Sequence, residues 1–288
     1  MIHAFLILFA TSRITADTLP LLRILASDYS YQAPAVFPAG NVRVRLVNVG
    51  QHPHHLVLSR MNDTLSLQQF FNDVLSPHPH GGYHDVGGPN MVAPGDSAEV
   101  WLTLTPGHYA LSCWVFSRSG KPHIAKGMFG EVVLQSGPTS PGEIPPGSWQ
   151  VEAREYRLDG PDTVEAGPVR LTFVNMGKQE HDVQLVRLPP FGSLTAVTKW
   201  ADAGMEGPVP GTLTGGASGI EPGMRVSVPL QLRRGRYALF CFVPDEHDGK
   251  PHYTHGMARL LLVRNESIFS GAAQLKRDSL GHERRTFS

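Results

Sequence analysis

The feature that most constrains this chain of 288 residues is an internal repeat. Short runs of the first half return in the second half, and the offset between matching residues lies between 127 (Gly40 and Gly167) and 129 (His123 and His252). The clearest matches are Gly107–Cys113 with Gly235–Cys241, Gly120–His123 with Gly249–His252, and Gly127-Met128 with Gly256-Met257. Self-similarity at a nearly constant spacing of this size predicts two copies of one folding unit.

The segments around the two copies suggest how the chain is organised. A short apolar run, Phe5–Ala10, is typical of an export signal and is too short to span a bilayer; a frayed N-terminal strand is the alternative. A stretch rich in Pro and Gly separates the copies, and the chain turns polar after Val263. We therefore predict a signal peptide at 1–16, one domain at 20–136, a linker at 137–148, a second domain at 149–264 and a flexible tail at 265–288.

Apolar and polar residues alternate with a period of two in both copies, which is typical of half-buried antiparallel strands. The alternation is clear at Val42, Val44, Leu46, Val228, Leu230 and Leu232. Each copy also contains one helical pattern, which begins after Ser66 in the first copy and after Ser193 in the second. The sequence therefore predicts an all-β protein of two tandem β-sandwiches, each with one short helical insertion.

Charge and hydropathy exclude some classes of partner. The formal net charge is zero and no stripe of Lys and Arg is visible, so we expect no nucleic-acid partner. No segment is long and apolar enough to be an integral membrane helix of the mature chain. The two cysteines, Cys113 and Cys241, form a disulfide only if their Cα atoms lie within about 7 Å, and their equivalent places in separate copies argue against that pairing.

Four potential metal ligands recur at matching places in the two copies. They are His54, Cys113, His123 and Met128 in the first copy, and His181, Cys241, His252 and Met257 in the second. A thiolate, two imidazoles and a long thioether form the trigonal blue copper site, which serves both Cu(I) and Cu(II). A single buried Cys or Met is more often part of the core, but the duplicated set favours up to one copper per domain. The repeat favours these histidines over the nearby His52, His55, His247 and His255.

With these residues the chain resembles the cupredoxin family, which includes plastocyanin and azurin. The resembling motifs are Gly107-x-Tyr109-x-x-x-Cys113, His123-x-x-x-Gly127-Met128, the Pro94-Gly95 turn and their counterparts in the second copy. The resemblance implies Greek-key sandwiches, one mononuclear copper in each domain and electron transfer as the activity. Two features depart from the family: nine residues separate Cys113 from His123 and ten separate Cys241 from His252, and His55 and Asp182 stand where plastocyanin-like members have Asn.

We therefore expect a periplasmic or secreted electron-transfer protein with a redox partner protein that the sequence does not identify. A two-domain copper oxidase or nitrite reductase is an alternative, but such an enzyme needs a further copper that is often connected through a His beside the Cys. Because neither Cys has such a neighbour, we expect that the chain is not an enzyme. A copper storage or delivery protein, or a sandwich without metal, is the other alternative. The loop with His78, His80 and His84 is expected to be solvated, although it offers ligands for a second metal.

Overall fold

The computed structural model describes residues 19–117, 119–137, 142–205 and 207–265. The predicted signal peptide and nearly all of the predicted tail lie outside these ranges. The first copy contains β1(Leu21–Ser27), β2(Ser30–Gln32), β3(Val36–Pro38), β4(Gly40–Asn48), β5(Val57–Met61), α1(Leu67–Val74), β6(Tyr83–Pro89), β7(Ser97–Leu104), β8(Gly107–Ser112) and β9(Phe129–Gln135). The second copy contains β10(Trp149–Arg154), β11(Arg157–Asp159), β12(Thr163–Glu165), β13(Gly167–Asn175), β14(His181–Arg187), α2(Leu194–Asp202), β15(Thr212–Ile220), β16(Arg225–Leu232), β17(Gly235–Phe240) and β18(Ala258–Arg264).

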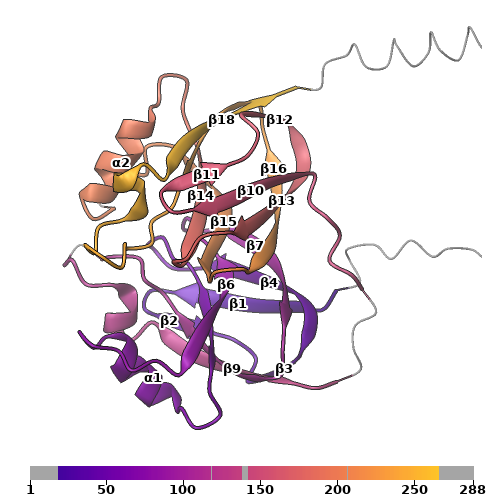
Figure 1. Cartoon of the computed structure of the whole chain (residues 1–288), viewed down its shortest axis with the longest axis vertical. Coiled ribbons are helices and arrows are strands. Elements are labelled where there is room, and N and C mark those ends of the chain that lie inside the picture. The colour runs from indigo at the N-terminus through magenta and orange to yellow at the C-terminus, as the bar shows by residue number, and fades with distance from the viewer. Residues whose placement is uncertain (1–18, 118, 138–141, 206, 266–288) are drawn as a thin grey trace, which may run out of the picture.

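The strands form two large sheets, as expected for an all-β sandwich, and the two copies lie one above the other in Figure 1. One sheet has the strand order β11-β10-β13-β16-β7-β4-β1-β2, and the other has the order β12-β18-β17-β14-β15-β6-β5-β8-β9-β3. Both sheets therefore run through both copies without a break. This continuity goes beyond the prediction of two sandwiches in tandem; the predicted domain limits remain predictions.

Glycines explain how the two copies come close enough to share a sheet. Strands β6 and β15 pair antiparallel across the boundary, with Gly88 opposite Ser218. A Cβ atom at Gly87 would lie 2.7 Å from Cδ1 of Ile220, and one at Gly219 would lie 2.7 Å from Cγ1 of Val57, in each case across the boundary. Both glycines also have positive φ, 103° and 67°, so glycine suits this close approach between the copies.

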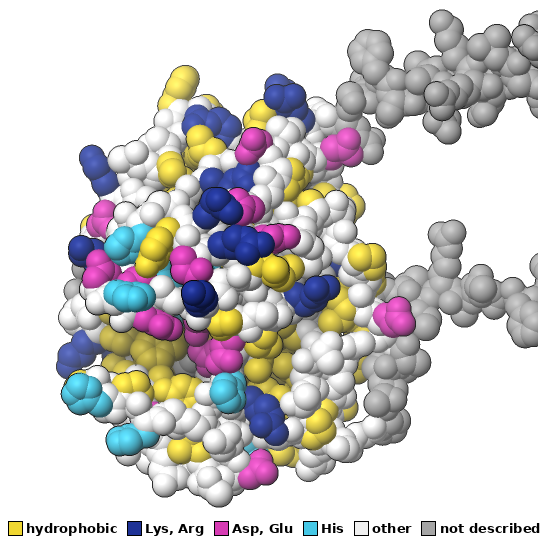
Figure 2. Space-filling model, viewed as in Figure 1, with side chains coloured by type: hydrophobic (Ala, Val, Ile, Leu, Met, Phe, Trp, Pro, Cys, Tyr) yellow, Lys and Arg dark blue, Asp and Glu magenta, His cyan; other side chains and the backbone are white. Residues whose placement is uncertain are grey.

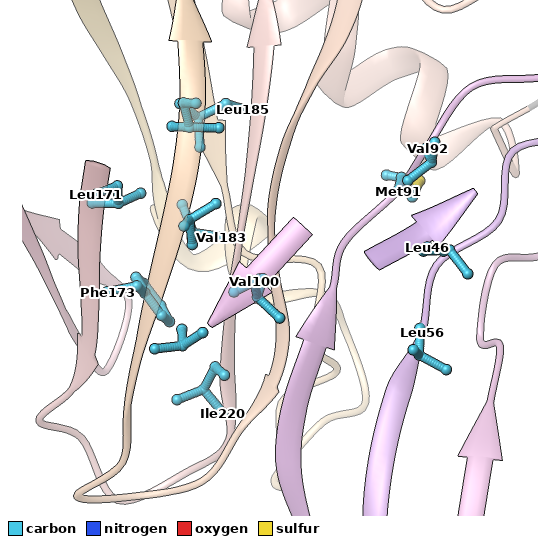
Figure 3. Close-up of a cluster of buried hydrophobic side chains, with 14 of the residues drawn as sticks. Leu46, Leu56, Met91, Val92, Val100, Leu171, Phe173, Val183, Leu185 and Ile220 are labelled. Atoms are coloured by element: carbon cyan, nitrogen blue, oxygen red, sulfur yellow. The ribbon is translucent and has the colours of Figure 1, made fainter. Parts of the chain in front are cut away.

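The core follows the alternation of the strands and continues from one copy into the other. Buried side chains of both copies form one cluster, and Figure 3 shows side chains of both copies in it. Members from the two copies include Leu46, Val100, Phe173, Leu185 and Ile220, each no more than 1% exposed. The alternation predicted for β4 is confirmed, because Val42, Val44 and Leu46 are fully buried.

The two helices cap the same side of the molecule in Figure 1 and begin where the sequence predicts. Ser66 and Gln69 form a capping box at the start of α1, with each side chain bound to the backbone N–H of the other residue. Ser193 caps α2 by accepting the N–H of Ala196. None of the helices in the described ranges is long and apolar enough to cross a membrane.

Candidate metal centres

Three of the four predicted ligands of the first copy meet at one end of the sandwich. His54 precedes β5, Cys113 follows β8, and His123 begins a short 3-10 helix, His123–Lys126. The Nδ1 atoms of the two imidazoles are 3.1 Å apart, and the Cys113 Sγ atom is 3.6 Å from Nδ1 of His123. All three side chains are at most 1% exposed. We call this group, together with Met128, the first centre.

The second copy builds the same arrangement. His181 begins β14, Cys241 follows β17, and His252 begins the 3-10 helix His252–His255. The two Nδ1 atoms are again 3.1 Å apart, and Cys241 Sγ lies 3.4 Å from Nδ1 of His252 and 3.8 Å from Nδ1 of His181. None of the three residues is exposed. With Met257 they form the second centre.

The donor atoms in both centres have the spacing that a metal ion requires. In each group one atom per residue, Nδ1 or Sγ, lies within 4.8 Å of the others. With metal–nitrogen bonds of about 2.0–2.1 Å and metal–sulfur bonds of about 2.3 Å, as in protein zinc sites, trigonal ligands stand roughly 3–4 Å apart. The observed separations fall in this range, and two imidazoles with a thiolate favour copper. The role of the eight predicted residues as ligands remains a prediction.

The two methionines are tied by the backbone to the other predicted ligands. Met128 is fully buried; its N–H donates to the His123 carbonyl at 3.0 Å, and its carbonyl accepts from Cys113 at 3.3 Å. Met257 is also fully buried and makes the corresponding bonds to His252 and Cys241, both at 3.1 Å. Each methionine follows a glycine in the left-handed region, with φ of 100° at Gly127 and 107° at Gly256. The backbone therefore turns sharply between the second His and the Met in both copies.

The long loops between Cys and the second His fold back on themselves. In the first copy Ser117 donates to the Lys121 carbonyl at 2.9 Å, and His123 donates to the Val115 carbonyl at 2.9 Å. In the second copy the backbone N–H of Asp245 donates to the Lys250 carbonyl at 2.8 Å, and that of His252 donates to the Val243 carbonyl at 2.9 Å. The extra residues form a small hairpin, and each loop still returns its His to the Cys.

Hydrogen bonds hold the outer nitrogens of His54 and His252, and a more distant carboxylate faces that of His181. His54 Nε2 lies 3.0 Å from Oδ1 of Asp28, and His181 Nε2 lies 3.8 Å from Oε1 of Glu155. His252 Nε2 lies 3.3 Å from Oε1 of Gln179 and 3.6 Å from Oδ2 of Asp245. A proton held on Nε2 leaves Nδ1 free to bind a metal, and such partners orient the ring.

Burial sets the protonation of these groups. Burial lowers the pKa of His123 and of His181 to about 4 and raises the pKa of the Cys113 thiol to about 11. Partial burial opposes ionisation of Asp28, but hydrogen bonds from the Gln51 N–H and from His54 and His52 lower its pKa to about 2. The first centre therefore offers neutral imidazoles, as metal binding requires, and a metal ion would have to displace the proton of the Cys113 thiol.

The residues that depart from the family pattern make a specific contact. His55 follows the first His of its copy, and its Nε2 atom accepts the backbone N–H of Trp114 at 2.6 Å. Asp182 stands at the equivalent place, and its Oδ1 atom accepts the N–H of Phe242 at 2.7 Å. Because Trp114 and Phe242 follow the two cysteines, both side chains tie the His strand to the Cys loop.

In the described ranges, none of the remaining histidines belongs to either group of donor atoms. His80 and His84 are largely exposed, with side chains 92% and 69% accessible, and they contact Asp73 and Glu221. Histidines of this kind are visible on the surface of both copies in Figure 2. His247 is 81% exposed and pairs with Asp245. His255 lies with Asp245 and Asp248 in a third group whose side chains come close enough to hold a metal ion.

Sequence reasoning missed the carboxylates beside the imidazoles, although the repeat contains the signal. Asp28-Tyr29 and Glu155-Tyr156 stand 127 residues apart, the same offset as His54 and His181. Both tyrosines have positive φ, 65° and 63°, and both rings pack on the second His of their centre, with centroids 5.0 Å apart for Tyr29 and His123. A search for repeated acid–aromatic pairs would have found them.

Comparison with known proteins gives matches among solved structures only; no family model and no curated protein matches the chain. An auracyanin from the photosynthetic bacterium Roseiflexus castenholzii is 20% identical and covers 40% of this chain and 96% of its own, with a TM-score of 0.29. A copper-containing nitrite reductase from Thermus scotoductus is 14% identical over 85% of this chain and 61% of its own, with a TM-score of 0.24. A multicopper oxidase is 18% identical over 85% of this chain and 89% of its own, with a TM-score of 0.26.

The likeness is to cupredoxin-fold copper proteins. It agrees with the resemblance stated from the sequence, with the all-β fold class and with copper as the metal that the two His–Cys–His groups would bind. At these identities and TM-scores the likeness assigns no activity to this chain.

The prediction that the chain is not an enzyme is contradicted by the same comparison. The similar structures include nitrite reductases and a multicopper oxidase, and these proteins are enzymes. That prediction rested on the residues beside Cys113 and Cys241, which are Ser112, Trp114, Phe240 and Phe242. A neighbouring His is only one way to connect a further copper, so its absence does not separate a carrier from an enzyme.

Proposed function

We propose that this chain is a copper protein in which each centre holds one copper and exchanges single electrons with a redox partner protein. The observation that carries the proposal is the convergence of two Nδ1 atoms and one Sγ atom, fully buried, at equivalent places in both copies. A bound copper would supply one-electron chemistry between Cu(I) and Cu(II). The apolar run at Phe5–Ala10 supports export to the periplasm or the cell exterior.

The side chains around each centre suit this role. Three separate segments supply the donor atoms, and hydrogen bonds to Asp28 and Gln179 orient the rings of His54 and His252. Such a framework limits movement of the ligands when the charge of the metal changes. The burial of His54, Cys113 and His123 also excludes water from the metal. We infer that electrons reach the first centre through His54 and Asp28, whose Oδ1 atom also lies 3.2 Å from Nδ1 of His52, a side chain that is 44% exposed.

The test is a titration of the purified protein with Cu(II), followed by visible absorption and by counting metal per chain. We expect two coppers and an intense charge-transfer band from copper–thiolate bonds. The double variant Cys113→Ser with Cys241→Ser should lose the band, whereas His80→Ala, which alters an exposed histidine, should keep it. A colourless protein without tightly bound copper would overturn the proposal.

The loaded protein should also be reduced and reoxidised, and it should be assayed with nitrite and with a phenol. Reversible cycling without turnover supports a carrier. Turnover of either substrate would assign the same two centres to an enzyme. Transfer of copper to a weak acceptor without reversible cycling would favour a storage or delivery protein.

A further inference from the structure

The two copies meet less completely in one sheet than in the other. Strand β16 pairs with β7 through Ser227 and Trp101, whereas β6 and β15 of the other sheet pair at three positions. Beside the Ser227–Trp101 pair lies a groove of about 1060 Å³ that residues of both copies line. The groove is separate from the two centres, because its lining contains none of the eight predicted ligands.

Arginines dominate the charged side chains of this groove. Five arginines and two carboxylates line it, which leaves an excess of three positive charges. They are Arg43, Arg45, Arg170, Arg187 and Arg233 against Asp96 and Glu99. The whole chain has a formal net charge of zero, so the excess is a local property of the boundary. A concentration of fixed cations in a groove attracts anions.

The first copy shows what an arginine binds at this place. Arg43 Nε donates to Oε1 of Glu99 at 2.7 Å, and its Nη2 atom donates to Oε2 at 3.4 Å. Arg45 Nε donates to Oε2 of the same carboxylate at 2.7 Å. A planar guanidinium suits a carboxylate, because its parallel N–H groups match the two oxygens. The first copy therefore supplies its own carboxylate.

The second copy keeps the arginine and lacks the carboxylate. Arg170 stands 127 residues after Arg43, and Ser227 stands 128 residues after Glu99. Arg170 Nη1 donates to the Pro146 carbonyl at 2.8 Å, but its Nε atom is buried and has no hydrogen-bond partner among the described residues. The Ser227 hydroxyl is also buried without a partner in the described part of the chain. Two polar groups are therefore unsatisfied where the first copy has an ion pair.

The position of Arg170 makes an unpaired charge costly. Its guanidinium lies over the Trp101 ring of the other copy, with Cζ 4.8 Å from the ring centroid. Trp101 is 6% exposed, so this contact holds the arginine against the boundary. Burial lowers the pKa of Arg170, because the charged form loses contact with water. An anion whose oxygens reach this guanidinium would compensate for that loss, as Glu99 does for Arg43.

We propose that the groove between β7 and β16 binds a small organic carboxylate, which Arg170 recognises. The ligand supplies to Arg170 the carboxylate that Glu99 supplies to Arg43, and the other arginines of the groove attract it. A dicarboxylate suits the excess of positive charge better than a monocarboxylate. The proposal goes beyond the proposed function and does not depend on copper.

The experiment is a calorimetric titration of the full chain with succinate at low ionic strength, where charges are least screened. We expect one succinate per chain. Succinamide, which has a similar shape without the charge, should not bind, and sulfate should bind more weakly than succinate. Arg170→Gln should weaken succinate binding by about tenfold or more, because hydrogen bonds between charged groups are lost. Arg170→Lys keeps the charge but loses the planar donors, so its affinity should be intermediate.

The sharpest variant is Ser227→Glu, which places a carboxylate where the first copy has Glu99. It should prevent succinate binding and raise the midpoint of thermal unfolding, and adding Arg170→Gln should cancel that rise. If Ser227→Glu does not fold, the two Arg170 variants still test the site. Arg157→Gln is the matched control, because Arg157 is a 67% exposed arginine outside the groove, and it should leave the affinity unchanged.

Absence of succinate binding in the parent would overturn the proposal, and so would equal affinity in the parent, Arg170→Gln and Arg170→Lys. An equal loss in Arg157→Gln would also overturn it, because net charge alone would then account for binding. Tighter binding of sulfate than of succinate would contradict the assignment of a carboxylate. The copper bands are recorded in the same samples; their absence would refute the proposed function and leave this site unaffected.

Discussion

The two centres share their donor atoms and differ in what surrounds them. The Nδ1 atoms of the imidazoles are 3.1 Å apart in both. The outer nitrogen of the first imidazole has a close carboxylate at 3.0 Å in the first centre, from Asp28, and a distant one at 3.8 Å in the second, from Glu155. The two copies therefore have the same arrangement of donor atoms but differ in the distance of the carboxylate from the first imidazole.

The neighbours of the two sulfurs differ as well. In the first centre the neutral Tyr31 hydroxyl lies near the Cys113 sulfur and donates to the His55 carbonyl. The equivalent residue of the second copy is Leu158, and there the Cys241 sulfur has the Asp182 carboxylate nearby. A neutral hydroxyl adds no net charge beside a thiolate, whereas an ionised carboxylate adds negative charge beside it. We therefore expect the first centre to have the higher reduction potential.

The largest effect is expected at the carboxylate of Asp28. Replacement by Ala should weaken copper binding at the first centre by about 10–100-fold, because ligating imidazoles depend on such partners. Glu155→Ala should cost the second centre less, because 3.8 Å is longer than a hydrogen bond. Competition with a chelator measures the copper affinity of each centre. The substitution Cys241→Ser isolates the first centre, and Cys113→Ser isolates the second. Equal losses in the two centres would contradict the difference described above.

A second substitution sharpens the comparison of the sulfurs. Asp182→Asn keeps an acceptor for the Phe242 N–H and removes the charge of the carboxylate, so it should raise the potential of the second centre toward that of the first. The physical reason is that less negative charge beside the thiolate stabilises Cu(I) relative to Cu(II). A redox titration followed by the absorption of each centre tests this. An unchanged or lower potential would show that the carboxylate does not act on the sulfur.

Substitution of the glycine before each methionine should have the same effect in both copies, since the two turns have the same backbone conformation. Gly127→Ala and Gly256→Ala should each lower the free energy of unfolding by about 1–2 kcal/mol, because an alanine is strained in the left-handed region. A Cβ atom meets nothing within 4 Å at Gly127 and only the Tyr156 carbonyl at 3.6 Å at Gly256. Denaturant unfolding of the metal-free protein checks the prediction. A large difference between the two variants would mean that the turns are not equivalent.

The smallest effect concerns an ion-pair cluster that exists in one copy only. Glu99 binds Arg43 and Arg45 at 2.7 and 2.6 Å, and the equivalent residue of the second copy is Ser227. Glu99→Gln should lower the free energy of unfolding by about 1 kcal/mol at neutral pH. Ser227→Ala, at the matching position, should change it less.

The contribution of Glu99 to the free energy of unfolding should decrease as the pH falls. Burial opposes ionisation of Glu99, but hydrogen bonds from Arg43, Trp101 and Arg45 lower its pKa below the usual value. The stabilisation is therefore complete above the unfolded-state pKa of about 4.3 and is lost as the pH falls through the lower folded-state pKa. Unfolding measured from neutral pH into this range should show a shallower loss in Glu99→Gln than in the parent. Parallel curves would contradict the assignment.

The repeat predicts which side chains converge, because it places His54, Cys113 and His123 in register with their counterparts, and their role as ligands stays a prediction. The sequence also predicts the strands that alternate and the helix starts at Ser66 and Ser193. The joining of the sheets was missed, since the glycine-rich strands β6 and β15 carry no hydrophobic alternation; the copies approach each other closely at Gly87 and Gly219. The carboxylates were missed because their contacts join residues distant in the sequence.

The central claim is that each copy builds its own copper centre, and copper counting in the two single variants tests it most directly. Cys113→Ser and Cys241→Ser should each keep one tightly bound copper and one charge-transfer band, and the two remaining bands should add up to the spectrum of the parent. The two variants should also differ in reduction potential, with the higher value in Cys241→Ser, which retains the first centre. Loss of all colour in either single variant, or an unchanged spectrum in one of them, would contradict two separate centres.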